Sequence, residues 1–137
     1  MLHSLMKHTA KIEVRYAETD AMGVVHHAVY PVWFEQARTE IMRINGCPYH
    51  LLEAEGFGFP VLQLEIDYKH SCRYGDFADV HITLAREDRL RIRLFYEVFV
   101  EGKLFVRGSS QHIFVKNGVP TRHAPKSFEN LFFPETP

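Results

Sequence analysis

The spacing of apolar residues changes along this chain from one period to another, and this change limits which elements the chain can form. One stretch has apolar residues three or four positions apart, as on one face of a helix: Tyr30, Phe34, Ala37, Ile41 and Ile44. Pro31 suits the first turn of a helix, and Asn45-Gly46 is a stop signal. Together these residues predict one long helix over residues 29–45.

Most of the remaining chain alternates apolar and polar residues, which is typical of half-buried β-strands. The alternating stretches are residues 8–17, 61–69, 78–85, 90–100 and 104–115. A shorter helix is predicted from Pro48 to Gly56, and Glu101-Gly102 predicts a tight hairpin turn. The order strand, long helix, short helix and four strands predicts an α+β fold. In it, a five-stranded antiparallel sheet packs on one helix within a single domain of residues 1–137.

The alternation also predicts which strand residues face the helix. In the first strand the predicted inward residues are Ile12, Val14 and Tyr16. In residues 61–69 they are Leu62, Leu64, Ile66 and Tyr68. Gly108, Ser109 and Ser110 are small residues in the middle of the last strand, so another backbone or a helix is expected to approach closely there.

Composition excludes several classes of protein. The 137 residues carry 16 basic and 17 acidic side chains, which is not the strong basic excess of a nucleic-acid-binding protein. Cys47 and Cys72 are far apart and are predicted to be reduced, and the histidine spacings predict no metal site. No segment approaches the ~20 apolar residues of a membrane span, and residues 1–14 do not resemble a signal peptide. A cytoplasmic enzyme or binding domain, without a transmembrane segment, is therefore expected.

The sequence ETDAMGVVHHAVYPVWFEQARTE, residues 18–40, places an acid, a glycine and two histidines where the first strand meets the long helix. Gly23 permits a sharp turn, and an Asp before it commonly forms or caps that turn. The alternative is chemical, because a carboxylate beside the unpaired N–H groups of a helix N-terminus can support acyl transfer. The spacing leaves Asp20 open to both interpretations.

Residues 15–40, RYAETDAMGVVHHAVYPVWFEQARTE, resemble the signature of the 4-hydroxybenzoyl-CoA thioesterase family. The order of an acidic residue, Thr-Asp, Gly-Val-Val, His, Tyr and Glu-x-Ala-Arg is most like its Tol-Pal-associated acyl-CoA thioesterase branch. Residues 59–76, FPVLQLEIDYKHSCRYGD, resemble the strand and turn that follow the helices in these enzymes. The resemblance implies the hotdog fold, in which a sheet wraps one long helix and strands pair across a homodimer, or within a homotetramer.

The resemblance also implies hydrolysis of an acyl-CoA thioester without a cofactor. It places Asp20 at the catalytic carboxylate, as nucleophile or general base, and the His27 backbone N–H opposite the thioester carbonyl oxygen. Whether the His27 imidazole also takes part stays open, and His26 is expected to point elsewhere because adjacent side chains rarely converge. The predicted substrate-binding residues are Gly23, Val24, Tyr30, Glu35, Phe59 and Val61, with Arg89, Arg122 and Lys126 for the coenzyme A phosphates.

Several alternatives remain at this stage. Tyr30 can belong to the core rather than to the pocket, and Glu35 can form a helix-surface salt bridge with Arg38, three residues on. A hotdog hydratase or dehydratase would pair His27 with Glu35. A non-catalytic acyl-CoA or acyl-carrier-binding module would keep the pocket without turnover, and an acyl carrier protein is a possible partner of the enzyme too. Short aliphatic, long-chain and aromatic acyl groups, including 1,4-dihydroxy-2-naphthoyl, are all open.

Overall fold

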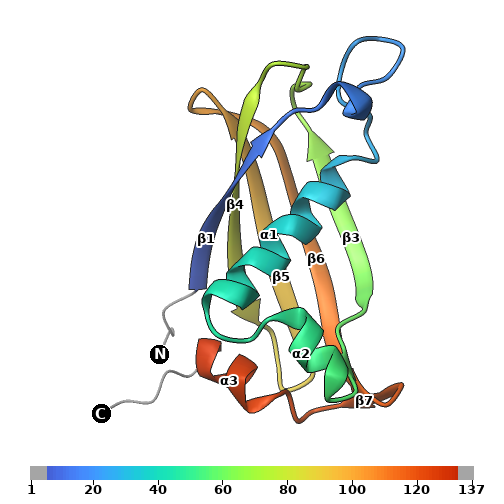
Figure 1. The fold of residues 1–137 in the computed structure, drawn as a ribbon, viewed down its shortest axis with the longest axis vertical. Helices are drawn as coiled ribbons and strands as arrows, with labels where there is room; N and C mark the ends of the chain where they lie inside the picture. The colour runs from blue at the N-terminus through green and yellow to red at the C-terminus, as the bar shows by residue number, and fades with distance from the viewer. Residues whose placement is uncertain (1–5, 133–137) are drawn as a thin grey trace.

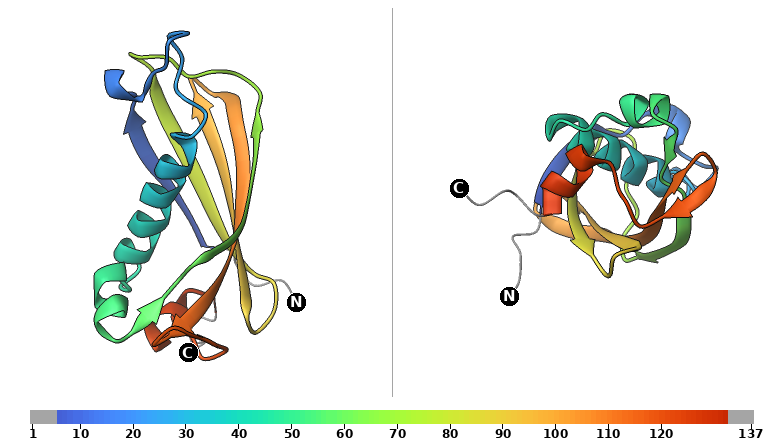
Figure 2. Two further views of the ribbon diagram at one scale, coloured as in Figure 1. Left: turned by 90° about the vertical axis from the view of Figure 1, so that its right-hand side faces the viewer. Right: turned by 90° about the horizontal axis from the view of Figure 1, so that it is seen from below.

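A curved antiparallel sheet holds the long helix against its concave face (Figures 1 and 2). The structure is a computed structural model that describes residues 6–132. Its elements in chain order are β1 (Met6–Glu13), the 3-10 turn η1 (Tyr16–Glu18), α1 (Tyr30–Ile44), α2 (Tyr49–Ala54), β2 (Phe57–Gly58), β3 (Val61–Tyr68), β4 (Phe77–Arg86), β5 (Arg91–Val100), β6 (Lys103–Lys116), β7 (Val119–Thr121) and α3 (Lys126–Phe132).

The five long strands lie in the order β1-β4-β5-β6-β3, and every neighbouring pair is antiparallel. The short strands β2 and β7 both pair with the far end of β6. Glu101 and Gly102 have φ of 50° and 77°, the two positive values that a tight type I′ turn between β5 and β6 requires. The predicted α+β arrangement of five long strands around one helix is confirmed.

The predicted helix boundaries are confirmed to within a few residues. Helix α1 runs from Tyr30 to Ile44, has proline in its first turn, and is followed by Gly46 at a φ of +84°. Helix α2 lies inside the predicted range, begins after Pro48, and ends before Gly56, whose φ is +88°. These glycines adopt left-handed backbone conformations at little cost, so they end the helices where the sequence predicts.

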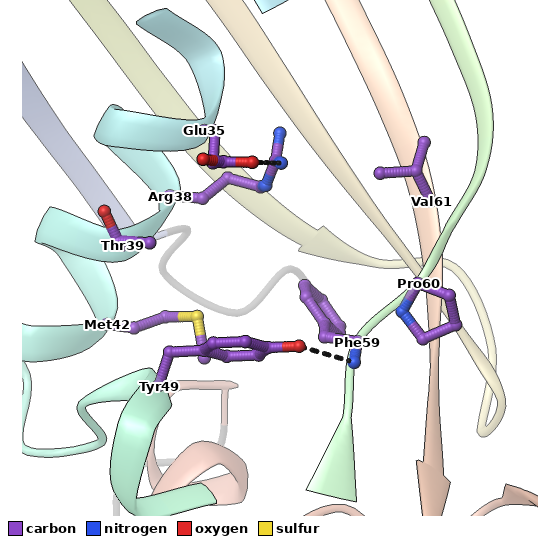
Figure 3. A pocket seen from close by; sticks show the side chains of 8 residues that line it. All are labelled: Glu35, Arg38, Thr39, Met42, Tyr49, Phe59, Pro60 and Val61. Carbon is purple, nitrogen blue, oxygen red and sulfur yellow. Dashed lines mark hydrogen bonds and ion pairs between the residues drawn. The ribbon is translucent and has the colours of Figure 1, made fainter. Parts of the chain in front are cut away.

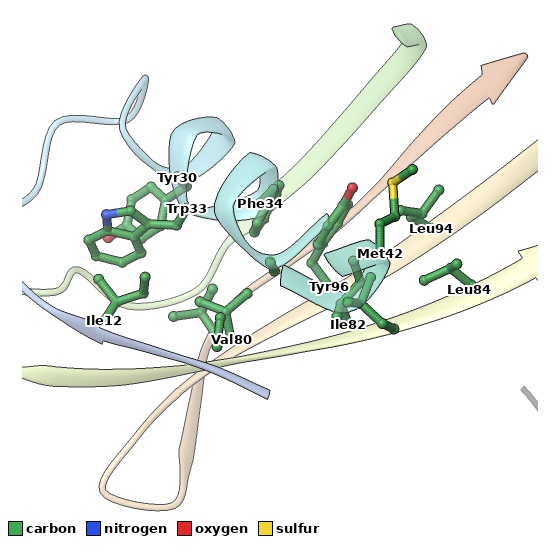
Figure 4. Packing of buried hydrophobic residues seen from close by; sticks show 14 of the residues in the cluster. Ile12, Tyr30, Trp33, Phe34, Met42, Val80, Ile82, Leu84, Leu94 and Tyr96 are labelled. Carbon is green, nitrogen blue, oxygen red and sulfur yellow. The ribbon is translucent and has the colours of Figure 1, made fainter. Parts of the chain in front are cut away.

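Helix α1 packs its apolar face onto the middle of the sheet (Figure 4). Its buried residues are Tyr30, Trp33, Phe34, Ala37, Ile41 and Met42. The predicted stripe is wrong only at Ile44, which is 59% exposed because it is the last helical residue. At the centre of the contact the Phe34 and Tyr96 rings stack, with centroids 4.1 Å apart. A Cβ added at Gly108 would lie 2.7 Å from the Phe34 ring, so the predicted close approach is confirmed.

Two predictions about the strands need correction. The first strand ends at Glu13, not at residue 17, and Tyr16 is 76% exposed rather than inward. The reason is that residues 16–18 form the 3-10 turn η1, held by hydrogen bonds to the Glu18 carboxylate. In β3, Tyr68 does face the helix and packs edge-on against Tyr30, with ring centroids 5.6 Å apart.

The second correction concerns the burial of β3. Leu62, Leu64 and Tyr68 remain 50%, 42% and 50% exposed. Strand β3 lies at the edge of the sheet and pairs only with β6 among the described strands, so one side of it is open. The buried hydrophobic core does not include these three side chains of β3. It does include Cys47 and Cys72, which are both free as predicted. Burial raises the pKa of each thiol to about 11, so both are protonated at neutral pH.

Candidate active site

The loop between β1 and α1 folds into a small hairpin that carries Asp20 at its tip. The Asp20 N–H donates to the Val24 carbonyl at 2.8 Å, and the Gly23 N–H donates to the Asp20 carbonyl at 2.9 Å. Thr19 and Val25 form an isolated antiparallel bridge behind this turn. Gly23 has a φ of +77°, so the sharp turn predicted at the glycine is confirmed. Gly23 and Val24 thus lie beside Asp20, as the sequence predicts.

The Asp20 carboxylate both shapes the turn and keeps one oxygen available. Its Oδ1 accepts a hydrogen bond from the Met22 N–H at 2.8 Å, which is the turn-forming interaction considered from the sequence. Its Oδ2 accepts no hydrogen bond from any residue in the range 6–132. The side chain is half-buried. The carboxylate is therefore held in place through one oxygen while the other stays free to react.

The turn that leads into α1 provides an unpaired N–H group. The main-chain N–H of His27 donates to no residue within the described part of the chain. The helix has no side-chain cap at Val29 and no acidic residue in its first turn. A helix N-terminus of this kind carries a partial positive charge. The next peptide is fixed from β3, since the Tyr68 hydroxyl donates to the His27 carbonyl at 2.8 Å.

The two adjacent histidine rings lie together, which corrects the expectation that they diverge. The imidazoles of His26 and His27 stack with centroids 4.2 Å apart. Residues 26–29 form a turn, in which Val29 N–H donates to the His26 carbonyl and Ala28 N–H donates to His26 Nδ1, so successive side chains are not splayed as in a strand. The His27 ring is exposed and makes no hydrogen bond to Asp20. The geometry therefore makes the main-chain N–H of His27 a better candidate for the site than its imidazole.

Glu18 belongs to the family signature, but the contacts of its side chain are not evident from the sequence. Its carboxylate is buried, accepts the Arg15 N–H at 2.8 Å and the Trp33 indole N–H at 2.9 Å, and pairs with the Arg15 guanidinium at 3.3 Å. Its main-chain carbonyl accepts the His26 N–H at 2.9 Å. Burial alone would raise the pKa of this carboxyl, but the hydrogen bonds from Arg15 and Trp33 outweigh burial and lower it. Glu18 thus ties the loop to α1.

Tyr30 takes the packing role that was one of its two interpretations. It is 2% exposed, and its hydroxyl accepts the Cys72 N–H at 3.2 Å. Its ring lies edge-on to Trp33 with centroids 5.0 Å apart. Burial raises the pKa of the Tyr30 hydroxyl, so it stays protonated. The side chain supports the loop from beneath rather than opening onto the cavities described next.

A cavity of about 380 Å³ lies between α1, α2 and the start of β3 (Figure 3). Its lining residues are Glu35, Arg38, Thr39, Met42, Tyr49, Phe59, Pro60 and Val61. Three of the predicted substrate-binding residues, Glu35, Phe59 and Val61, are thereby brought together. Glu35 is 69% exposed, and its carboxylate lies 4.0 Å from the Arg38 guanidinium, so the predicted pair is present but long.

A second cavity, of about 620 Å³, gathers basic side chains beside the β4–β5 loop. It is lined by Arg86, Asp88, Arg89, Arg122 and His123. Two of the predicted phosphate-binding residues, Arg89 and Arg122, therefore share one hollow. The third, Lys126, is the exposed first residue of α3 and does not line it. Figure 1 shows that the β4–β5 loop lies at the opposite end of the molecule from the loop that carries Asp20.

Residues 6–132 contain neither a cluster of metal ligands nor a membrane-spanning helix. No three His, Cys, Asp or Glu side chains in this range gather closely enough to hold a metal ion. No helix in the same range is both long and apolar enough to cross a membrane.

An antiparallel sheet wrapped around one long helix is the hotdog architecture, and the comparisons agree with it. The crystal structure of a DHNA-CoA thioesterase from Staphylococcus aureus has a TM-score of 0.81 and 38% sequence identity, over 85% of this chain and 80% of that one. The model of the Thioesterase-like superfamily matches residues 14–129, so the chain belongs to that superfamily. The family resemblance drawn from residues 15–40 is thereby confirmed.

Two curated relatives carry related names. The Bacillus subtilis (strain 168) protein named "Putative acyl-CoA thioesterase YneP" is 39% identical over 106 residues, 77% of each chain. The acyl-CoA thioesterase YbgC of Haemophilus influenzae is 44% identical over 66 residues, 47% of this chain and 48% of that one.

Proposed function

We propose that this protein hydrolyses acyl-CoA thioesters to a free acid and coenzyme A, with Asp20 and the His27 N–H as its catalytic groups. One observation carries the assignment of residues: a carboxylate oxygen and a main-chain N–H just before the N-terminus of α1, both without partners among the described residues, belong to one braced loop. Membership of the thioesterase-like superfamily and the names of the relatives support the reaction class.

In this mechanism the thioester carbonyl oxygen accepts a hydrogen bond from the His27 N–H. Charge develops on that oxygen as the carbonyl carbon is attacked, and a donor placed there contributes roughly 3–4 kcal/mol. In one route the Asp20 oxygen attacks, the C–S bond breaks, coenzyme A leaves as a thiolate, and water hydrolyses the resulting anhydride. In the other route Asp20 takes a proton from water, which attacks instead, and the proton passes to the departing thiolate.

A homodimer formed through β3 would complete this site. The strand is an edge with apolar side chains about half exposed, and unpaired edges of this kind tend to pair with another strand. In a two-fold antiparallel pairing, the start of β3 at Val61 lies toward Tyr68 of the partner subunit. Since Tyr68 holds the His27 carbonyl, the loop of one chain would then lie beside the Phe59–Val61 cavity of the other.

The same pairing would give the basic cavity a role in binding coenzyme A. It turns one chain end for end relative to the other, so the Arg89 and Arg122 end of one subunit comes to the Asp20 end of its partner. Guanidinium groups bind phosphate oxygens through paired N–H donors. We assign this cavity to the coenzyme A phosphates, keep Lys126 as a phosphate contact from outside it, and assign the 380 Å³ cavity to the acyl group.

The proposal also covers the cellular location, the thiol carrier and the oligomeric state. We propose a cytoplasmic location, because Cys47 and Cys72 are both unpaired. An acyl carrier protein can replace coenzyme A as the thiol carrier, and a homotetramer can form from two such dimers. Parallel assays with both carriers, and the mass of the protein in solution, distinguish these possibilities.

The assignment is tested by replacing Asp20 with asparagine, which keeps the shape and removes the charge. We expect kcat to fall at least about a hundredfold on a panel of acyl-CoA substrates, followed by release of free thiol. Asp79→Asn is the matched control, because Asp79 pairs with Lys11 on the sheet surface, and it should leave kcat unchanged. Undiminished turnover by Asp20→Asn would refute the role of Asp20. Hydration of an enoyl-CoA without thiol release would refute the hydrolase.

A further inference from the structure

A chain of buried hydrogen bonds runs from the acyl cavity into the core and does not belong to the catalytic loop. The Arg38 guanidinium donates to the Tyr96 hydroxyl at 3.1 Å, and Tyr96 and Ser110 hydroxyls lie 2.7 Å apart. Ser110 lies 2.8 Å from His112 Nε2, and His112 Nδ1 lies 3.2 Å from the Phe59 carbonyl. Tyr96, Ser110 and His112 are fully buried, so each polar atom depends on this chain for a partner.

Burial lowers the pKa of His112 to about 4, so its ring is neutral at pH 7, and one assignment of protons then satisfies every link. The Phe59 carbonyl can only accept, so His112 carries its proton on Nδ1 and its Nε2 is an acceptor. Ser110 must then donate to Nε2 and accept from the Tyr96 hydroxyl. The Tyr96 oxygen is left to accept from Arg38, which can only donate. All four hydrogen bonds therefore point the same way, and they fix the guanidinium at the cavity wall.

The guanidinium itself has donors to spare. The Arg38 side chain is only 14% exposed, yet one of its N–H groups is used by Tyr96 and its nearest described carboxylate, Glu35, is 4.0 Å away. That distance is too long for a hydrogen bond, and Glu35 is itself largely exposed. A guanidinium has five N–H donors, so Arg38 keeps donors that can bind an acceptor inside the cavity. Figure 3 shows Arg38 directed into the space between α1 and Val61.

We propose that Arg38 selects acyl groups that carry an acceptor oxygen, a carboxylate or a hydroxyl, at the end away from the thioester. This inference rests on the proposed function, because it assigns the 380 Å³ cavity to the acyl group of the same substrate. The remaining wall, formed by Met42, Phe59 and Val61, suits the apolar body of such a group, and among the described residues that line the cavity only Arg38 is positively charged. Arg38 is thus a specificity residue, held in position by Tyr96.

The test uses substrates that differ only at the far end of the acyl group. Glutaryl-CoA is compared with pentanoyl-CoA, and 4-hydroxybenzoyl-CoA with benzoyl-CoA, and the ratio of kcat/KM within each pair is measured. The wild type should prefer the oxygen-bearing member of at least one pair about tenfold or more, since hydrogen bonds to charged groups are the stronger ones. Arg38→Met should abolish that preference while leaving hydrolysis of the apolar member within about threefold.

Matched variants separate a selective role from a structural one. Arg43→Met removes an exposed arginine from the same helix and should leave both ratios unchanged. Arg38→Lys keeps the charge, so it remains informative if Arg38→Met does not fold, and it should reduce the ratio without abolishing it. Equal hydrolysis of both members of both pairs by the wild type, or an equal loss for both members in Arg38→Met, would overturn the inference. Neither result touches the proposed function, which is tested separately by Asp20→Asn and by the release of free thiol.

Discussion

At the scale of single residues, His112 shows how burial sets a protonation state. It is fully buried, stacks on Phe59 with ring centroids 4.4 Å apart, and has its pKa lowered to about 4 by burial and by the nearby Arg38 charge. In the unfolded chain its pKa returns to about 6.5. As the pH falls from about 6.5 towards 4, the unfolded chain binds a proton at His112 that the folded chain does not bind. The folded state should therefore lose stability in this window and keep it above pH 6.5.

This predicts that the free energy of unfolding of the wild type falls by about 2 kcal/mol between pH 7 and pH 5 through His112. His112→Gln carries a donor and an acceptor but does not titrate, so its loss over the same interval should be smaller by that amount. Urea unfolding at both pH values measures the difference. Equal losses in the two proteins would show that His112 is not protonated preferentially in the unfolded state. The lowered pKa of Glu18 acts only at more acidic pH, below the window.

The sequence predicts some residues of the site and not others, for a definable reason. The sharp turn at Gly23 and the free N–H at His27 depend on neighbouring residues, so local patterns and the family signature indicate them. Glu18 is bound to Trp33, 15 residues away, and Arg38 to Tyr96, 58 residues away. Such pairs exist only once the tertiary fold has formed. The family signature contains both residues, but nothing in the local sequence indicates these partners.

At the scale of elements, α1 packs closely against β6 at Gly108, a residue that has no side chain. A Cβ at Gly108 would lie 2.7 Å from the Phe34 ring and 2.9 Å from the Glu65 carbonyl oxygen. The ring could shift, but the carbonyl belongs to the backbone of β3. Gly108→Ala should therefore destabilise the protein by about 1–3 kcal/mol, the usual cost of overpacking. Ser109→Ala is the control on the same strand, and urea unfolding should show a change of about 0.5 kcal/mol.

A Gly108→Ala variant as stable as Ser109→Ala would mean that helix and sheet are further apart than the structure shows. At residues 108–110 the sequence predicts the packing well, because a glycine weakens a strand and often marks the close approach of another group. The ends of strands are predicted less well. Alternation continues through Tyr16, but the contact of Glu18 with Trp33 turns the chain away from the sheet. A tertiary contact here overrides a local pattern.

At the scale of the whole molecule, β3 is the element that its own chain does not complete. Its alternation predicts a buried inner face, yet Leu62 and Leu64 remain about half exposed. Periodicity reports that a face will be covered and not which chain covers it, so pairing across a dimer remains a prediction. Asp20 and the basic cavity lie at opposite ends of one chain. That a partner subunit brings them together is likewise a prediction.

Mixing two inactive variants tests this arrangement. In the proposed dimer each site takes Asp20 from one subunit and the Arg89 and Arg122 cavity from the other. Asp20→Asn chains have intact basic cavities, and chains with both Arg89→Ala and Arg122→Ala have intact Asp20 loops. When the two are unfolded together and refolded, half of the dimers are mixed, and each mixed dimer has one complete site of two. The mixture should recover about a quarter of wild-type turnover, measured at low acyl-CoA concentration where the arginines matter most.

The result depends on which chain supplies each half of the site. If Asp20 and the basic cavity of the same chain served one substrate, every mixed dimer would hold two defective sites, and mixing would restore nothing. Refolding each variant alone controls for gains due to refolding itself. Raising the salt concentration should weaken the recovered activity at low substrate, because phosphate contacts with exposed arginines are screened over about 8 Å at physiological ionic strength. Recovery on mixing would thus place the phosphate contacts and the reacting carboxylate on different subunits.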